Sequence, residues 1–164
     1  MKILNVIGIT GFLLCLLLMQ TTNHGPRGIQ KFDPSFRLPD MRFHYSGKSL
    51  KPVLERIGEE GRKAYKRFLQ LDFIFISCFL ITMLTITNAG FVSNPVRILL
   101  IITAIMRAVL DVTENALLLH MLNKYPEFNE KTAVICSWST TVKFIMLYTW
   151  LLLLVIQFVV HRIN

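Results

Sequence analysis

Hydrophobic residues fall in four long blocks that are separated by polar segments. The blocks cover roughly residues 3–20, 68–87, 98–121 and 133–160. A helix needs about 20 mostly apolar residues to cross the hydrocarbon core of a bilayer. The pattern therefore predicts an all-α protein, a four-transmembrane-helix bundle. Because the blocks use up most of the chain, residues 1–164 are expected to form a single integral membrane domain without a separate soluble domain.

The segment between the first two blocks, residues 21–67, is predicted to be a basic cytoplasmic loop that carries a short amphipathic helix. Up to residue 49 it is rich in turn-forming residues, with aromatic and basic residues interleaved among them. Such a stretch can pack over the ends of the helices as a connector, which is the interpretation we favour. Alternatively, it lies along an anionic membrane surface.

The amphipathic helix is predicted from the spacing of apolar residues after position 49. These follow an i, i+3, i+4, i+7 pattern: Leu50, Val53, Leu54 and Ile57. Pro52 is expected in the first turn of this helix, and Gly58 is expected to end it. Glu59 and Glu60 suit the N-terminal turn of a new helix that continues into the second block.

Four cations lie directly before the second block: Arg62, Lys63, Lys66 and Arg67. Cations beside a membrane helix mostly anchor its cytoplasmic end, which is the interpretation we favour here. The alternative is that they bind a specific lipid headgroup. In both cases they are predicted to form a basic membrane surface.

Positive charge is distributed unevenly between the two sides of the predicted bundle. The loops 21–67 and 122–132 share a side and together hold thirteen Lys and Arg residues, whereas the other side holds three: Lys2, Arg97 and Arg162. The positive-inside rule then places both loops in the cytoplasm and both termini outside, without identifying the membrane. Since topology accounts for the formal net charge of +8, and no RNA- or DNA-binding motif is present, no nucleic-acid partner is expected.

The first block allows two interpretations. It is either an uncleaved first helix, which we favour, or a signal peptide. No small-x-small cleavage site follows Met19, and most of the nearby positive charge comes after the block rather than before it. Cleavage would leave a product with three spans.

The third block is unusual because it carries a polar stripe in an apolar segment. Arg107, Asp111, Glu114 and Asn115 are three or four residues apart and therefore share one helical face. An ionisable side chain near the membrane centre costs about 2.5–3.5 kcal/mol on insertion scales. The stripe is thus expected to face protein or water rather than lipid.

Two further charged residues extend this stripe, Asp72 in the second block and Lys143 in the fourth. At a rise of about 1.5 Å per residue, Lys143 falls at the depth of Asp111 in an antiparallel neighbour, and Asp72 falls near Asn115. The predicted cluster is nearly neutral, as a buried ionic network requires. It comprises six residues: Asp72, Arg107, Asp111, Glu114, Asn115 and Lys143. The fourth block also opens with small hydroxyl residues, which favour close helix packing or cross-helix hydrogen bonds.

Three functions are compatible with this cluster. The favoured one is an interaction or assembly protein in which the network fixes the helices or holds a partner. The second is binding or transport of a small amphipathic ligand in an intramembrane polar pocket. The third is an enzyme that uses Asp111 and Glu114 as acid and base. Expected partners are the lipid bilayer and, according to the function, other membrane proteins or an amphipathic ligand.

No cofactor, disulfide or metal site is predicted. Cys15, Cys78 and Cys136 fall inside apolar blocks and form no C-x-x-C pair. The four histidines match no zinc pattern such as H-E-x-x-H. Without a nucleophile or cofactor motif, the sequence leaves enzymatic activity undetermined.

Several motifs between residues 40 and 145, taken in order, point to a resemblance. In order, they are Gly58-x-x-Gly61-Arg62-x-x-Tyr65, Asp72, Asp111-x-x-Glu114-Asn115, Tyr125-Pro126 and Lys143. In this order they resemble a group of small, mainly bacterial four-helix integral membrane proteins that has no assigned activity. The resemblance implies a four-helix topology and groups these positions as one unit. Here the stretch after Asp72 lacks the proline that this group often carries.

Overall fold

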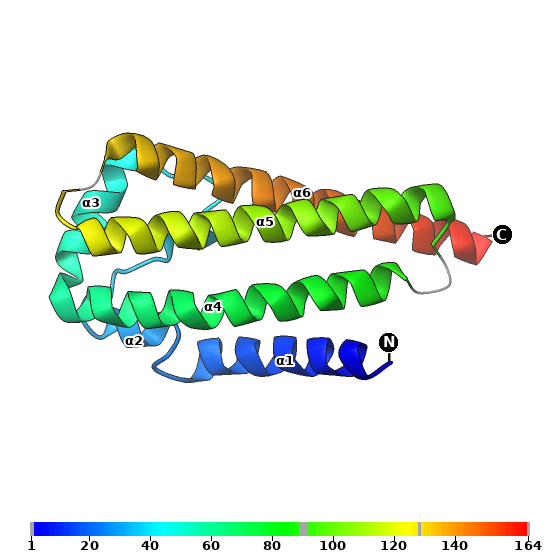
Figure 1. Ribbon diagram of the computed structural model, residues 1–164, viewed down its shortest axis with the longest axis horizontal. Helices are drawn as coiled ribbons and strands as arrows, with labels where there is room; N and C mark the ends of the chain where they lie inside the picture. Colours follow the sequence, from blue (N-terminus) through cyan, green and yellow to red (C-terminus); the bar gives the residue numbers. More distant parts are fainter. Residues whose placement is uncertain (1, 89–91, 128, 164) are drawn as a thin grey trace.

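The computed structural model describes residues 2–88, 92–127 and 129–163, which contain helices and no strand. Four long helices run alongside one another in the bundle (Figure 1). They are α1 (Lys2–Thr21), α4 (Gly58–Thr87), α5 (Asn94–Lys124) and α6 (Glu130–Ile163). Two short helices lie at one end of the bundle, α2 (Pro26–Gln30) and α3 (Gly47–Arg56), and the 3-10 helix η1 (Pro39–Met41) lies in the segment between them. Both chain termini lie at the opposite end (Figure 1).

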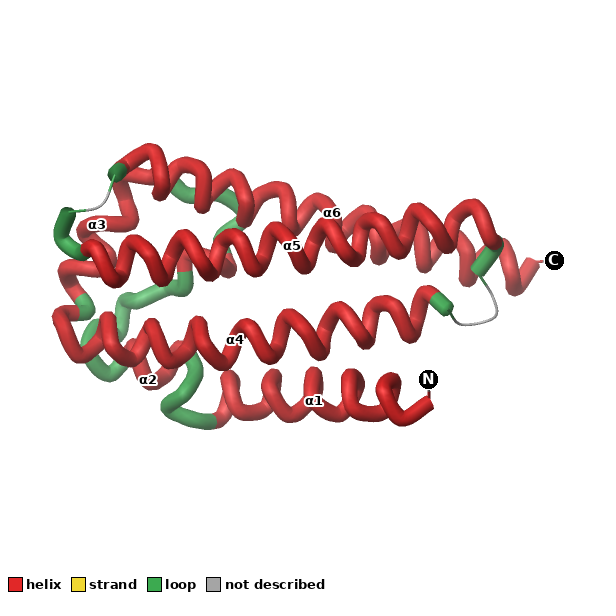
Figure 2. The backbone as a smooth tube through the Cα atoms, in the orientation of Figure 1, coloured by secondary structure: helices red, strands yellow, loops and turns green. Residues whose placement is uncertain are grey.

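The long helices pack in chain order. α5 packs against both α4 and α6, and α1 packs against α4. The short helices and the connections from α1 to α4 lie toward the end of the bundle away from the termini (Figure 2). α4, α5 and α6 are longer than the apolar blocks, and their added turns contain polar residues.

Three segments of the described chain are long and apolar enough to cross a membrane: Ile3–Gln30, Gly58–Thr87 and Glu130–Ile163. The protein is therefore helical, with three candidate membrane spans. α5 is 31 residues long, but it carries the charged stripe of Arg107, Asp111 and Glu114 within its apolar part. α5 is long enough to cross a membrane, but these charges keep it from being apolar enough to count as a candidate span.

α1 approaches α4 closely at two glycines. A Cβ atom at Gly8 would lie 2.3 Å from Ile81 Cγ2, and one at Gly11 would lie 2.6 Å from Cys78 Sγ. Small residues allow helix backbones to approach closely in a lipid environment, where packing drives association. The ring of Phe12 also stacks on Phe75 and Phe79 of α4, so close packing and ring contacts together hold α1 to the bundle.

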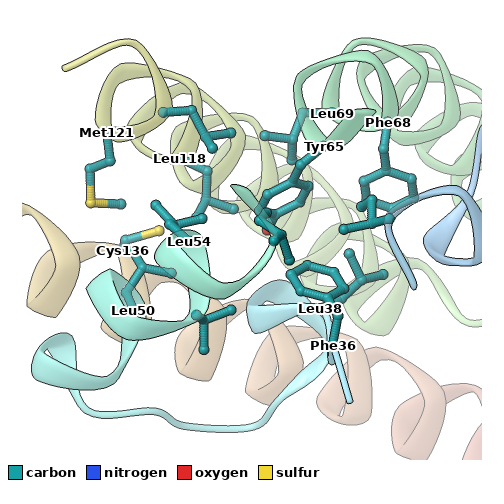
Figure 3. Packing of buried hydrophobic residues seen from close by; sticks show 14 of the residues in the cluster. Phe36, Leu38, Leu50, Leu54, Tyr65, Phe68, Leu69, Leu118, Met121 and Cys136 are labelled. Carbon is teal, nitrogen blue, oxygen red and sulfur yellow. The ribbon is translucent and has the colours of Figure 1, made fainter. Parts of the chain in front are cut away.

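The segment between α2 and α3 forms part of the core. Phe36 and Leu38 are buried and point toward Tyr65 and Phe68 of α4 (Figure 3). The rings of Phe36 and Tyr65 meet edge to face at 5.5 Å between centroids. The favoured interpretation of this loop as a packed connector agrees with these contacts, although the loop also contains α2 and η1, which the turn-rich sequence did not predict.

α3 packs on the same cluster through its apolar face. Leu50 and Leu54 point toward the ends of α5 and α6, where Leu118, Met121 and Cys136 lie (Figure 3). Burying an aliphatic side chain of this size contributes about 1.5–3 kcal/mol. The predicted amphipathic helix is thus confirmed, and its buried face is the predicted one.

The boundaries of α3 correct the expected position of Pro52 and confirm the expected roles of Gly58 and of Glu59 and Glu60. Pro52 lies in the second turn rather than the first, because the helix already begins at Gly47. Pro52 has no N–H to donate to the carbonyl of Lys48, four residues earlier. Both residues are exposed, so water can solvate that carbonyl. Gly58 has a φ of +64° at the junction with α4, a conformation that favours glycine. Glu59 and Glu60 occupy the first turn of α4.

Short side-chain hydrogen bonds attach the loop backbone to α6. Ser137 Oγ donates to the Tyr45 carbonyl at 2.6 Å and accepts a hydrogen bond from the Tyr45 N–H at 3.0 Å. Thr141 Oγ1 donates to the Phe43 carbonyl at 2.8 Å. Ser137 and Thr141 therefore bind a loop, whereas Thr140 of the same set makes the predicted bond between helices, to Glu114 of α5.

The four predicted membrane-surface cations all lie in the first turns of α4, at the end of the bundle that holds the loops: Arg62, Lys63, Lys66 and Arg67. Arg62 is half-buried, donates to the Leu54 carbonyl at 3.0 Å and stacks 4.0 Å above the Tyr125 ring. Lys63 pairs with both glutamates of the first turn. Arg62 thus ties α3 and α5 to α4 in addition to any role at a membrane surface.

Asp33 fixes the start of the loop. Its Oδ1 accepts hydrogen bonds from the Ser35 N–H at 2.9 Å and the Ser35 hydroxyl at 2.6 Å, and its Oδ2 pairs with Arg56 Nε at 3.1 Å. The hydroxyl bond first, and the Arg56 charge with it, lower the pKa of Asp33 below its ordinary value.

We predict that Gly8→Ala destabilises the protein by about 1–3 kcal/mol, because the new methyl group would overlap Ile81. Thermal unfolding in detergent measures the effect. The matched control is Thr10→Ala, which lies on the exposed face of α1 and should leave the melting temperature nearly unchanged. Equal melting temperatures for both variants would contradict the close approach.

The lowered pKa of Asp33 predicts a pH dependence of stability. A carboxylate with a depressed folded-state pKa contributes stability above its unfolded value, about 3.9, and that contribution is lost as the pH falls through the folded value. The stability difference between wild type and Asp33→Asn should therefore be constant near neutrality and shrink below about pH 4. Ser35→Ala should move this loss toward higher pH, and unfolding measured across the pH range tests both.

Candidate functional site

Lys143 of α6 holds two carboxylates of α5. Its Nζ lies 2.7 Å from Asp111 Oδ1 and 2.5 Å from Glu114 Oε2. The three side chains are 8%, 3% and 0% exposed. Asp111 and Glu114 can share one cation because residues three apart project from the same face of a helix.

The remaining oxygen of each carboxylate also has a partner. Arg107 Nη2 pairs with Asp111 Oδ2, and the guanidinium lies 4.3 Å above the ring of Phe79. Thr140 donates its hydroxyl proton to Glu114 Oε1. Each carboxylate oxygen therefore lies beside a cation or a hydroxyl donor, which makes a buried ionic network tolerable at low dielectric. Glu114 Oε2 is held by its ion pair with Lys143 alone, and Arg107 Nη1 has no hydrogen-bond partner within the described chain.

α4 joins this network through a hydrogen bond. Asn115 Nδ2 donates to Asp72 Oδ2 at 2.7 Å. Asn115 is fully buried, and within the described chain its Oδ1 has no hydrogen-bond partner. The six sequence-predicted residues are thus gathered at the interfaces of α4, α5 and α6, with Asp111 beside Lys143 and Asp72 beside Asn115.

Asp40 of η1 is a further buried carboxylate that sequence reasoning missed. It is 4% exposed, and Tyr65 OH donates to its Oδ1 at 3.3 Å. It is close enough to Lys143 and Asp111 to interact electrostatically with both, and burial raises the pKa of the Asp40 carboxyl. In the sequence it lies in a Pro-Asp pair of a turn-rich loop, so nothing local indicates that it enters the bundle.

Adding Asp40 changes the charge of the site. The buried charged groups of the site are four carboxylates and two cations: Asp40, Asp72, Asp111, Glu114, Arg107 and Lys143. Their formal sum is minus two, compared with minus one for the sequence-predicted set. The surplus negative charge belongs to Asp40 and Asp72, because Asp111 and Glu114 are matched by Arg107 and Lys143.

Asp40 and Asp72 both line a cavity of about 470 Å³ between α1, α2, η1 and α4. Most of the wall is apolar, and Gln20, Arg27 and Met41 are exposed at its rim. The remaining lining residues are Leu16, Met19, Pro26, Leu38, Phe68 and Phe75. An apolar cavity with a few convergent polar groups is the usual form of a small-molecule site.

The arrangement favours binding over metal or acid–base chemistry. No group of three or more His, Cys, Asp or Glu side chains in the described residues is arranged to hold a metal ion. Asp111 and Glu114 are the two carboxylates that could act as acid and base. Their oxygens already contact Arg107, Lys143 or Thr140 within the protein. Of the four buried carboxylates of the site, Asp40 and Asp72 line this cavity.

We predict that Lys143→Met destabilises the protein by about 3–5 kcal/mol, because it leaves Glu114 buried without a cation. Glu114→Gln in the same chain should recover part of this loss, with a coupling energy on the order of 0.5–3 kcal/mol. Unfolding of both single variants and the double variant in detergent gives this energy. Lys124→Met, at the exposed end of α5, is the control, and additive losses would contradict the ion pair.

Comparison with known proteins gives no relative of this chain. No protein-family model, no curated protein and no solved structure matches it. Function therefore has to be inferred from the residues of the chain itself.

Proposed function

We propose that this chain is a multi-pass membrane protein that binds a small amphipathic molecule in the cavity between α1 and α4. One observation carries the proposal: two buried carboxylates, Asp40 and Asp72, meet an otherwise mainly apolar cavity of about 470 Å³. A volume of this size suits a single small ligand.

The surface of α5 supports a fourth span. Its charged residues turn inward toward α4 and α6, whereas its other face is apolar and exposed, with Ile98 62%, Ile102 52% and Val109 54% exposed. A helix with this division can face lipid on one side and protein on the other.

The two ends of the bundle support the proposed topology. The loops with most of the basic residues lie at one end, and both termini lie at the other (Figure 1). By the positive-inside rule, the end with loops 21–67 and 122–132 faces the cytoplasm.

In this proposal the ionic network has a structural role: it holds α5 and α6 together beside the cavity. Lys143 pairs with Asp111 and Glu114, and Arg107 pairs with Asp111 through Nη2, so both cations are used inside the chain. The cavity lined by Asp40 and Asp72 favours ligand binding over the interaction or assembly role. The internal pairing of the charges fixes the helices under either role. It also weighs against an acid–base enzyme built on Asp111 and Glu114.

The apolar wall of the cavity suits an apolar tail on the ligand. Leu16 and Met19 of α1 and Phe68 and Phe75 of α4 face the cavity. An aliphatic tail buried against them gains about 0.8 kcal/mol per methylene group, while the two carboxylates interact with the polar head.

Native mass spectrometry of the detergent-purified protein tests this proposal. Wild type should retain a small molecule that Leu16→Trp, which fills part of the cavity, does not retain. Leu17→Trp is the matched control, because Leu17 is 57% exposed on the other face of α1. A wild type without bound mass, or equal retention in both tryptophan variants, would overturn the proposal.

A further inference from the structure

Resting on this proposed function, we infer that the polar head of the bound amphiphile is a protonated amine that lies between Asp40 and Asp72. The ligand class is then a single-chain alkylammonium compound. The juxtaposition of two buried carboxylates in one cavity wall points to this head.

Charge complementarity is the first argument. The buried groups of the site carry two more carboxylates than cations, and the surplus faces the cavity. Ionised carboxylates without a cation are costly at low dielectric, which is why burial raises the pKa of Asp40. An ammonium group beside the two aspartates would supply the compensating charge and favour their ionised forms. An anionic head would add to the surplus.

Hydrogen-bonding capacity is the second argument. Asn115 engages Oδ2 of Asp72, and Tyr65 engages Oδ1 of Asp40. An ionised carboxylate has about four acceptor sites, and a primary ammonium has three donors. Both carboxylates can therefore accept further bonds from one amine, which a hydroxyl group with a single donor could not match.

The position of Arg27 agrees with this assignment. It is the cation in the cavity wall, but it is exposed at the rim, where water weakens its attraction for an anion. The rings of Phe68 and Phe75 lie in the wall together with Asp72, and aromatic faces also attract cations. The aromatic rings beside Asp72 thus favour a positive head over a negative one, and the exposed Arg27 opposes it only weakly.

The test compares octylamine, octyltrimethylammonium, octanol and octanoate, which share one tail and differ in the head. Octylamine is protonated at pH 7, as an alkylamine with a pKa close to that of lysine. Titration followed by native mass spectrometry should show octylamine binding to wild type at least about tenfold more tightly than octanol or octanoate. Octyltrimethylammonium should bind more weakly than octylamine because it has no N–H donor.

Variants distinguish recognition of the ammonium head from binding of the apolar tail in the cavity. Asp72→Asn and, independently, Asp40→Asn should remove most of the preference for octylamine and leave octanol binding unchanged. Glu127→Gln, which makes the same charge change at an exposed site between α5 and α6, should retain the preference. Because wild type alone reports the preference, the test does not depend on the folding of either aspartate variant.

The outcomes distinguish the two proposals. If all four probes bind wild type alike and Leu16→Trp weakens them all, the cavity binds amphiphiles and the inferred head is wrong. If octyltrimethylammonium equals octylamine, the charge is recognised and the N–H donors are not. If no probe binds, or if Leu16→Trp binds as wild type does, both the inferred head and the proposed function fail.

Discussion

The ammonium group of Lys143 is the constraint on which the other contacts depend. It bridges two carboxylates one turn apart on α5, and leaving either unpaired would cost several kcal/mol. A slip of α6 by one residue would rotate Lys143 away from both. The ion pairs therefore fix the register of α5 and α6, and the hydrogen bond between Asn115 and Asp72 ties α4 to the same level.

This register also determines where the loop can lie. Ser137 and Thr141, on the same helix as Lys143, bind the loop backbone next to η1. Asp40 is thereby held among the helices, although it belongs to a turn. The two acidic groups of the cavity are consequently positioned in different ways: Asp72 by a helix, and Asp40 by a loop anchored to α6 and packed on Tyr65.

The long helices and the polar cluster were accessible from sequence because both depend on periodicity. Spacings of three and four residues place Asp111, Glu114 and Asn115 on one face, and the helix rise places Lys143 at the depth of Asp111. The burial of Asp40 and the cavity were not accessible. They arise from contacts between segments far apart in the chain, such as Phe36 with Tyr65, which no local pattern encodes. Pro52 was misplaced because the polar residues before Leu50 gave no apolar signal for an earlier helix start.

The pairing of α5 with α6 has a consequence for biogenesis. In the proposed topology, α5 emerges from the ribosome before α6, with two carboxylates and one arginine in its apolar part. At about 2.5–3.5 kcal/mol for each charged residue near the membrane centre, α5 alone is a poor candidate for lateral exit from the translocon into lipid. Lys143 neutralises it only after α6 has been synthesised. The two helices should therefore enter the bilayer together, as a preassembled hairpin.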